Sequence, residues 1–167
     1  MHNESEDQFL AAYDKYADAI FRHCFFRLMD RDRARDLTQD VFLRTWEYIQ
    51  KGTKVENIRA FLYRVANNLV IDFVRKKSAV SLDFLHEKGF DPVEGGQGNV
   101  AVAGEVGEML RIVALIEPQY REVILMRYVE GMGPKEIAEA VQESENAVSV
   151  RLNRGIKKIR DYMRIDS

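Results

Sequence analysis

Cysteine, proline and histidine are scarce in this chain of 167 residues, which contains one, three and three of them. The single cysteine, Cys24, cannot form an internal disulfide, which suits a reducing compartment, so we expect a cytoplasmic protein. Few prolines, together with abundant leucine, alanine, arginine and glutamate, favour helices. His2, His23 and His86 are scattered, and no spacing of histidine or cysteine suits a metal site. The composition predicts a helical protein that holds no metal.

Long apolar runs and catalytic patterns are missing as well. No apolar run approaches the roughly 18 to 20 residues that span a bilayer, so we expect no membrane insertion. The acidic, polar start MHNESEDQFL does not resemble a secretory signal. The stretch EGGQG lacks the lysine and the following helix of a phosphate-binding loop. Glu136 and Glu139 form a carboxylate pair, which we expect on a solvated helix face. The sequence therefore predicts a protein that is not an enzyme and needs no cofactor.

The net charge is only −2, but charge alternates strongly along the chain. Residues 1–30 and 79–110 carry −3 and −5, whereas residues 31–78 and 111–167 carry +5 and +1. Within residues 149–164, six cations accompany one acid, Asp161. Two basic regions separated by an acidic one are not typical of a uniformly solvated surface. The alternation indicates two separate regions that could face a polyanion.

Residues 79–103 differ in composition and periodicity from the segments on either side. They contain Pro92 and several glycines, and they show no sustained helical period. We therefore expect an acidic linker there, which joins an N-terminal domain at residues 1–78 to a C-terminal domain at 104–167. A long loop within a single domain is the alternative.

Residues 1–78 predict three helices that pack as a three- or four-helix bundle, because none of them could stand alone. We expect the first helix at 9–28, with Asp30 as its stop or as a cap. The second is expected at 31–50 and ends at Lys51, Gly52 and Thr53, since glycine suits the left-handed conformation after a helix. The third is expected at 56–77. Apolar residues at helical spacing define the buried side of the first helix: Leu10, Tyr13, Ala17, Ile20, Phe21, Cys24, Phe25 and Leu28. The equivalent residues of the second helix are Ala34, Leu37, Val41 and Tyr48, with Phe42, Trp46 and Ile49 beside them. Those of the third are Leu62, Val65, Ala66, Leu69 and Phe73.

Two asparagines, Asn67 and Asn68, lie in the middle of the third predicted helix. Asparagine is a mediocre helix former, yet its amide offers a donor and an acceptor together, as reading a base edge requires. Two ordinary surface residues would fit the local sequence equally well. The run from Arg75 to Lys77 is consistent with a phosphate clamp or with cations that complement a helix C-terminus.

The C-terminal segment has the layout of a helix-turn-helix. A helix before Pro118 and another after it are followed by a short helix that starts at Gly133-Pro134, where a first-turn proline is tolerated. The turn QESE leads into a long basic helix for which Ser144 is a good N-cap. In this layout the second helix enters the major groove of DNA. Expected buried residues after Pro118 are Val123, Ile124, Met126, Tyr128 and Val129. In the last helix they are Val148, Leu152, Ile156, Ile159 and Met163.

Two other interpretations of the basic helix fit its sequence less well. A helix that is only solvated usually interleaves glutamate with lysine at four-residue spacing, and residues 146–160 do not. A membrane-surface helix would need large aromatic anchors on its apolar face, which here is required for the core. Contact with DNA phosphates is favoured over both.

Two stretches together resemble bacterial extracytoplasmic-function (ECF) sigma factors of the sigma-70 superfamily. DLTQDVFLRTW (36–46) and AFLYRVANNLVIDFVRKK (60–77) are similar to the second conserved region of that family. ALIEPQYREVILMRYVEGMGPKEIAEAVQESENAVSVRLNRGIKKIR (114–160) is similar to the fourth. A helix-turn-helix alone would be a weak signal because many regulators share it, whereas its coupling to the first two stretches is specific.

The resemblance implies a subunit that takes core RNA polymerase to promoter DNA and helps to open it. It implies docking on the clamp helices of the largest polymerase subunit and on the flap of the second-largest, and an anti-sigma factor as a further partner. Residues implied to bind core polymerase are Asp36, Gln39, Asp40, Leu43 and Glu47. Those implied at the −10 element are Phe61, Arg64, Asn67, Asn68, Arg75 and Lys76. Those implied at the −35 element are Ser149, Val150, Arg151, Asn153, Arg154, Lys157 and Lys158.

The chain departs from the family pattern at several positions. Gly133-Pro134 replaces the usual serine start of the short helix, and Gln142 stands close to where the turn normally has glycine. Val150 cannot hydrogen-bond, although it can contact a thymine methyl. Gly155 is an unusual helix breaker. The alternatives kept open are a stand-alone helix-turn-helix regulator, which would bind DNA tightly without polymerase, and a pure protein-interaction module.

Overall fold

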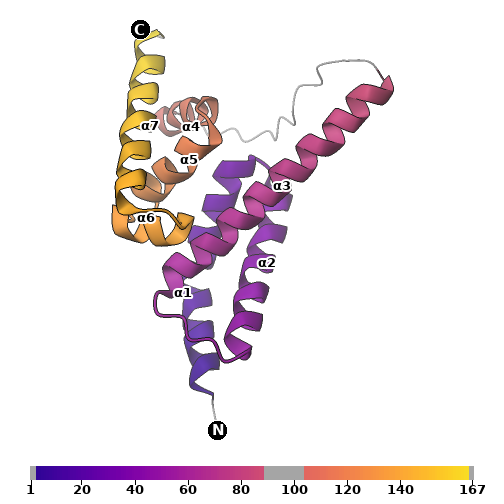
Figure 1. Ribbon diagram of the computed structural model, residues 1–167, viewed down its shortest axis with the longest axis vertical. Coiled ribbons are helices and arrows are strands. Elements are labelled where there is room, and N and C mark those ends of the chain that lie inside the picture. The colour runs from indigo at the N-terminus through magenta and orange to yellow at the C-terminus, as the bar shows by residue number, and fades with distance from the viewer. Residues whose placement is uncertain (1–2, 89–103, 166–167) are drawn as a thin grey trace.

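The computed structural model describes residues 3–88 and 104–165, and within these ranges the chain is helical with no strand (Figure 1). The N-terminal half consists of α1 (Glu4–Leu28), α2 (Arg31–Gln50) and α3 (Ile58–Lys88). The C-terminal half consists of α4 (Glu105–Leu115), α5 (Pro118–Ile124), the π-helical turn η1 (Leu125–Val129), α6 (Pro134–Val141) and α7 (Glu145–Ile165). The predicted all-α class with a helix-turn-helix is confirmed. Residues 89–103, most of the predicted linker, lie outside the described ranges.

Met29 and Asp30 set the turn between the first two helices, and only Asp30 was predicted as a stop or cap. Met29 ends α1 in the left-handed conformation at φ 52°. Asp30 then caps α2, because its side chain accepts a hydrogen bond from the Arg33 amide at 3.1 Å. After α2, Gly52 adopts φ 81°, a conformation that side chains disfavour. The predicted bounds of the second helix, 31–50, are confirmed.

The first helix begins earlier than predicted, and two residues of its expected buried side are exposed. Leu10 is 53% exposed and Tyr13 is 48% exposed. The ring of Tyr13 lies edge-on against Phe42 of α2, with 4.9 Å between ring centroids, and its other side faces solvent. The prediction was wrong for these two residues: the first turns of α1 pack against α2 through Phe9 and Tyr13, which meet Phe42, whereas Ile20 and Cys24 further along are fully buried.

The third helix is longer than predicted. It starts after Asn57, whose side-chain oxygen accepts from the Ala60 amide at 3.0 Å, and it runs to Lys88 rather than to Lys77. Residues 79–88 contain no glycine or proline, so nothing in the sequence ends the helix there. The first part of the segment predicted as linker is therefore helical. The buried residues Leu62 and Ala66 are as predicted.

The C-terminal half forms the predicted helix-turn-helix. Ser144 caps α7 by accepting a hydrogen bond from the Ala147 amide at 3.1 Å. Gln142 ends α6 in the left-handed conformation at φ 57°, at the turn for which glycine was the expected residue. Gly133 precedes Pro134 without a side-chain cap.

Three residues predicted for burial in this half are exposed instead, which corrects the prediction. Met163 is half exposed because it lies in the last turns of α7, at the end of the chain. Tyr128 and Val129 lie in η1. There a backbone amide donates to the carbonyl oxygen five residues earlier, as Glu130 N does to Leu125 O at 3.1 Å. The wider π turn changes which residues face the core, so ordinary helical spacing fails at this point.

Gly155 allows α7 to approach α5 closely. A Cβ added at this position would lie 3.0 Å from Cγ1 of Ile124 and 3.3 Å from Cβ of Tyr120. The glycine that looked like a helix breaker is therefore a site of helix packing.

We predict that Gly155→Val lowers the free energy of unfolding by about 1–3 kcal/mol, the usual cost of overpacking. Chemical denaturation of both proteins measures it. Lys157→Val at an exposed position of α7 is the control, because it carries the same β-branched side chain without the clash. Equal losses in the two variants would contradict the packing explanation.

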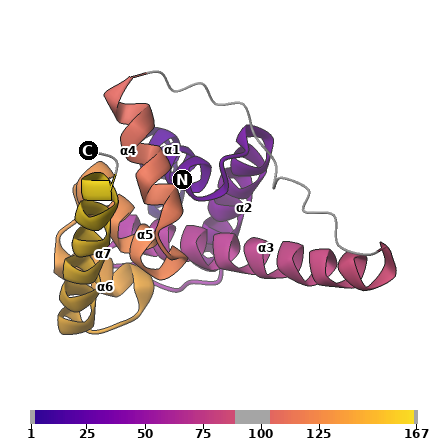
Figure 2. The same cartoon turned by 90° about the horizontal axis from the view of Figure 1, so that it is seen from above.

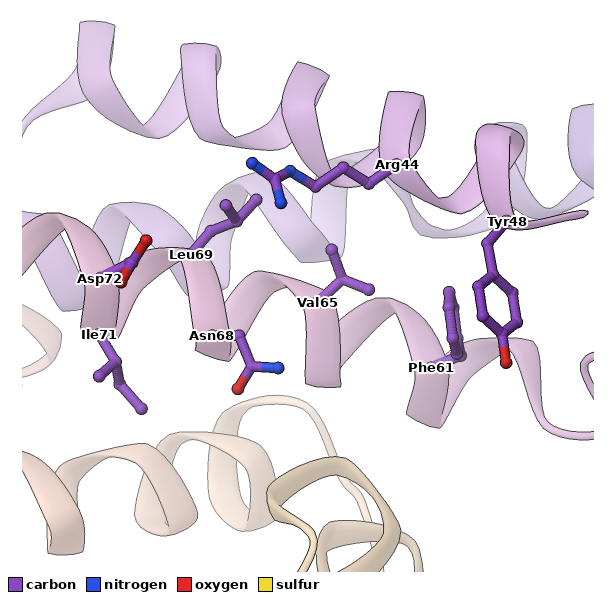
Figure 3. A pocket seen from close by; sticks show the side chains of 8 residues that line it. All are labelled: Arg44, Tyr48, Phe61, Val65, Asn68, Leu69, Ile71 and Asp72. Atoms are coloured by element: carbon purple, nitrogen blue, oxygen red, sulfur yellow. The ribbon is translucent and has the colours of Figure 1, made fainter.

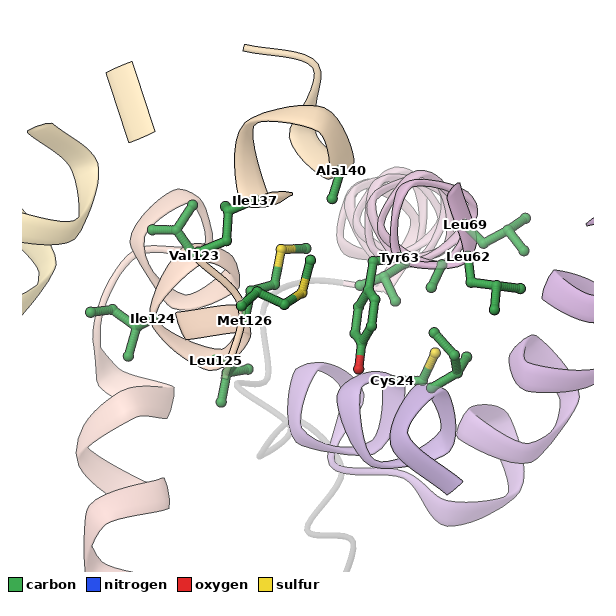
Figure 4. Close-up of a cluster of buried hydrophobic side chains, with 14 of the residues drawn as sticks. Cys24, Leu62, Tyr63, Leu69, Val123, Ile124, Leu125, Met126, Ile137 and Ala140 are labelled. Atoms are coloured by element: carbon green, nitrogen blue, oxygen red, sulfur yellow. The ribbon is translucent and has the colours of Figure 1, made fainter. Parts of the chain in front are cut away.

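The two halves pack against each other, with α6 beside the first turns of α3 (Figures 1 and 2). One cluster of buried side chains continues from the N-terminal helices into the C-terminal ones. In Figure 4, Tyr63 of α3 lies between α1 and Met126, and Ala140 of α6 lies next to α3. The sequence did not reveal whether the halves touch, and in this structure they do.

Candidate nucleic-acid interface

A groove between α2 and α3 is the first candidate site (Figure 3). Its volume is about 550 Å³. Tyr48 of α2 and Phe61 of α3 lie at one end with their ring centroids 4.7 Å apart and their planes inclined by 33°. Aromatic surfaces of this kind stack an unpaired base regardless of its sequence. The lining residues are Arg44, Tyr48, Phe61, Val65, Asn68, Leu69, Ile71 and Asp72.

Sequence reasoning found Phe61 and Asn68 but missed three polar or aromatic residues of this groove. Arg44 and Tyr48 lie one turn apart on α2, and Asp72 lies one turn beyond Asn68 on α3. The prediction that Tyr48 lies on the buried side of its helix is wrong, because Tyr48 is 39% exposed. The shared spacing of four residues was the signal that could have identified both rows. In the groove, Arg44 supplies hydrogen-bond donors and Asp72 supplies acceptors beside the aromatic surface.

The two neighbouring asparagines have different environments. Asn68 is exposed at the groove, whereas Asn67 is buried and its side-chain oxygen accepts a hydrogen bond from Nη1 of Arg27 at 2.6 Å. Consecutive helix residues point about 100° apart, so a pair cannot share one face. The structure thus corrects the expectation that both asparagines reach a ligand, because Asn67 joins α3 to α1.

The other predicted −10 residues lie on the outer surface of α3. Arg64, Arg75 and Lys76 are all exposed. Arg75 pairs with Asp72, and Nζ of Lys76 lies 3.6 Å from the same carboxylate. Exposed pairs of this type contribute little to stability, so both cations can exchange this partner for a phosphate.

The predicted polymerase-binding residues form an exposed row on α2. Leu43, 55% exposed, stands among polar and acidic side chains rather than in the core. An exposed large apolar residue with charged neighbours is consistent with a protein contact surface. The exposed residues of this row are Asp36, Gln39, Asp40, Leu43 and Glu47.

Most of the predicted −35 residues are accessible on α7. Val150, Asn153, Arg154 and Lys157 are exposed, and Ser149 is half-buried. Lys158 is held at 2.6 Å from Oε1 of Glu117 and lies over the ring of Tyr120. The outward surface of this helix is therefore polar and basic.

Arg151 differs from its neighbours because it points back into the protein. Its side chain is only 15% exposed and pairs with Glu122 of α5 and with Glu143. It also donates to the backbone oxygen of Gln119 at 2.6 Å. In this conformation Arg151 holds α7 to α5. It does not extend toward a ligand, although the sequence predicted that it would.

None of the helices in the described residues is both long and apolar enough to cross a membrane. Among the same residues, no group of three or more histidine, cysteine, aspartate or glutamate side chains is placed to hold a metal ion.

Comparison with protein families matches both halves. A family model described as "Sigma-70 region 2" matches residues 12–80, and one described as "Sigma-70, region 4" matches residues 107–159. A similar curated protein is the ECF RNA polymerase sigma factor SigX of Bacillus subtilis, 26% identical over 96% of this chain and 86% of SigX. The ECF sigma factor SigW of the same organism is 27% identical over 95% of this chain and 90% of SigW.

Solved structures share the fold over almost the whole chain. The sigma factor RpoE of Bartonella quintana, solved with the anti-sigma factor NepR, superimposes with a TM-score of 0.75 at 16% identity, covering 96% of this chain and 99% of RpoE. CnrH, solved with the cytosolic domain of CnrY, superimposes with a TM-score of 0.72 at 20% identity, covering 97% of this chain and 91% of CnrH. The chain belongs to the sigma-70 family, in its ECF group, and is an RNA polymerase sigma factor for promoter-specific initiation of transcription.

Proposed function

We propose that the groove between α2 and α3 captures an unstacked base of the −10 element and that α7 reads the −35 element. The observation that carries this proposal is the groove, where the rings of Tyr48 and Phe61 adjoin an exposed asparagine. A base that leaves the duplex would stack on the rings, and Asn68 would hydrogen-bond to its polar edge. Capturing the base stabilises the open strands, so recognition and melting are coupled.

Phosphate contacts would position the melted strand. Arg64, Arg75 and Lys76 are exposed on α3 and can each meet a phosphate. Such contacts supply affinity that falls with salt and little sequence information. Asn67 is left out of the proposed surface, because its side chain is buried against Arg27.

At the −35 element, α7 would enter the major groove through its first turns. Ser149, Val150, Asn153 and Arg154 would face base edges, and Val150 would favour a thymine methyl. Lys157 and Lys158 would hold the phosphate backbone, the latter after exchanging Glu117 for a phosphate. We assign Arg151 to the support of α7, since its guanidinium is engaged by Glu122.

The exposed row on α2 would bind core RNA polymerase, at the clamp helices of its largest subunit, with the C-terminal half near the flap of the second-largest. The chain would then act in the cytoplasm as a specificity subunit without catalytic activity of its own. An anti-sigma factor is a further proposed partner, because RpoE and CnrH, which share the fold, were each solved with a second protein.

Transcription by core RNA polymerase tests the proposal. The purified chain would be mixed with core enzyme and a genomic promoter library, and the transcripts would be sequenced. Discrete start sites that share two spaced motifs are expected. Absence of start sites, together with failure to co-elute with core enzyme, would contradict it, and tight DNA binding without polymerase would favour the regulator alternative.

Within that assay, Asn68→Ala should weaken initiation by about fivefold to 150-fold, as expected for one lost base contact of roughly 1–3 kcal/mol. Because Asn68 is exposed, the thermal stability of the Asn68→Ala protein should equal that of the unsubstituted protein. Gln8→Ala removes an exposed amide from α1 and serves as the control. Arg154→Ala should alter only the −35 motif among the recovered start sites. Equal activity of Asn68→Ala and Gln8→Ala would remove Asn68 from the site.

A further inference from the structure

Another cavity lies on the side of α3 that faces the start of α5, and of its lining residues only Ile71 also lines the groove beside α2. Its volume is about 550 Å³, within the range of about 300–1,000 Å³ that small-molecule sites span. No aromatic side chain of the described residues lines it, so it offers no surface on which a base would stack. The apolar residues of its lining are Val70, Ile71, Val74, Ala79 and Pro118.

Most of this apolar lining is a stripe along α3 that the other described helices leave partly open. Ile71 and Val74 lie one turn apart on the same side of α3, and they are 46% and 44% exposed. In Figures 1 and 2, α3 passes α5 and continues away from the other helices. Large apolar side chains that stay open beside a cavity favour an apolar ligand.

Arginine side chains form the polar part of the same lining. The side chain of Arg27 is only 4% exposed, Arg121 is half-buried, and Arg75 lies at the exposed rim. Burial lowers the pKa of both Arg27 and Arg121. Water therefore compensates these two charges poorly, and an anion placed between them would do so better.

Arg121 has donors left for such an anion. Its Nε and Nη2 donate to three backbone oxygens at and just after the end of α4, at 3.2, 2.7 and 3.0 Å. Among the described residues, its Nη1 has no hydrogen-bond partner and no carboxylate pairs with it. Glu122, the carboxylate that faces Arg27, is already shared with Arg151. The buried positive charge beside the cavity thus exceeds what this carboxylate can balance.

We propose that this cavity binds a free carboxylate with a single alkyl chain, a fatty acid, with its tail along the stripe on α3 and its head between Arg27 and Arg121. A guanidinium binds a carboxylate through two parallel hydrogen bonds, and the apolar stripe removes the tail from water. The site lies between two helices, so it admits one chain and excludes the flat surface of a bilayer. This inference does not depend on the proposed function.

Isothermal titration calorimetry of the full chain tests the site, with octanoate and decanoate kept below the concentrations at which they form micelles. Affinity should rise about fourfold for each methylene, and so about fifteenfold from octanoate to decanoate. Decan-1-ol and decylammonium carry the same tail without the negative charge, and they should bind at least about tenfold more weakly than decanoate. Vesicles of phosphatidylglycerol, which present anionic head groups but no free chain, should not bind.

Two substitutions separate the tail site from the head site. Val74→Asn should weaken decanoate about tenfold, whereas Val129→Asn makes the same change at an exposed position outside the cavity and should have no effect. Arg121→Gln should weaken decanoate about tenfold and leave decan-1-ol unchanged, with Arg35→Gln on the exposed side of α2 as its control. Val74 is exposed, so its variant keeps the test decisive if Arg121→Gln lowers stability.

Each contrary outcome overturns the proposal in a recognisable way. Absence of decanoate binding would remove the site. Equal affinity for decanoate and decylammonium, or equal affinity in Val74→Asn and Val129→Asn, would mean adsorption that does not use the cavity. Vesicle binding that Val74→Asn abolishes would assign the surface to a membrane. An acidic amphipathic peptide that binds there while decanoate does not would assign the cavity to a protein partner instead.

Discussion

Glu122→Gln is expected to lower the free energy of unfolding by about 3–5 kcal/mol, the usual loss when one partner of a buried ion pair is removed. The Glu122 side chain is 8% exposed and faces Arg27 of α1, which is 4% exposed, with 3.8 Å between Nη2 and Oε2. Arg151 of α7 meets the other carboxylate oxygen. Burial lowers the pKa of Arg27 and the Glu122 carboxylate opposes that shift, so neutralising Glu122 leaves two cations in a poorly hydrated site.

Urea denaturation of Glu122→Gln and of the unsubstituted chain measures this difference. The control is Glu143→Gln, which removes the second carboxylate that pairs with Arg151. Since Glu143 is 44% exposed, its loss should cost no more than about 1 kcal/mol. If both variants lose the same amount, burial of the pair is not what stabilises the protein.

Acid is expected to destabilise this protein through one histidine. His23 is fully buried, and neither of its ring nitrogens has a hydrogen-bond partner among the described residues. Burial, together with a smaller effect of the positive charge of Arg27, lowers the pKa of His23 to about 3. The folded state thus keeps the ring neutral while the unfolded state takes up a proton below about pH 6.5, the ordinary value for histidine.

The contribution of the neutral His23 ring to the free energy of unfolding is therefore complete above about pH 6.5, and it is lost as the pH decreases toward 3. The expected slope is about 1.4 kcal/mol for each pH unit within that window. Denaturation at pH 7.5, 5.5 and 4.5 should show the slope, and His23→Leu should remove its share of it. Carboxylates titrate in both proteins, so the difference between the two proteins is the quantity to compare. Parallel curves would mean that His23 does not determine the acid sensitivity.

Local signals predicted the helices well because caps and turns depend on neighbouring residues. Asp30 and Ser144 are short acceptors at positions where a helix start leaves amides without partners, and the structure uses both as caps. Gly52 was placed after α2 for its left-handed conformation, which it adopts. The end of α3 was missed because the glycines and Pro92 led to the prediction of a linker over the whole of 79–103, whereas the helix continues to Lys88, before the first of these residues.

The contact between the halves could not have been predicted from these signals. Arg22 and Glu130 are 108 positions apart, and in the sequence each looks like an ordinary surface charge. The same holds for the site: helical period placed Asn68 and Arg154 on outward faces, but it could not show that Arg151 turns inward to Glu122. Pairings of this kind depend on tertiary packing, which charge counts along the chain do not contain.

The π turn η1 has a consequence for how the chain tolerates insertions and deletions. A π turn accommodates one more residue than an α-helical turn, so removing one residue between Leu125 and Val129 should restore regular winding without rotating the segment that follows. Glu130 would then stay beside Arg22. The same deletion in the regular turns of α5 would rotate the following segment by about 100° and would separate the two residues. The contact between the two halves of the molecule should therefore tolerate a one-residue deletion in η1 better than one in α5.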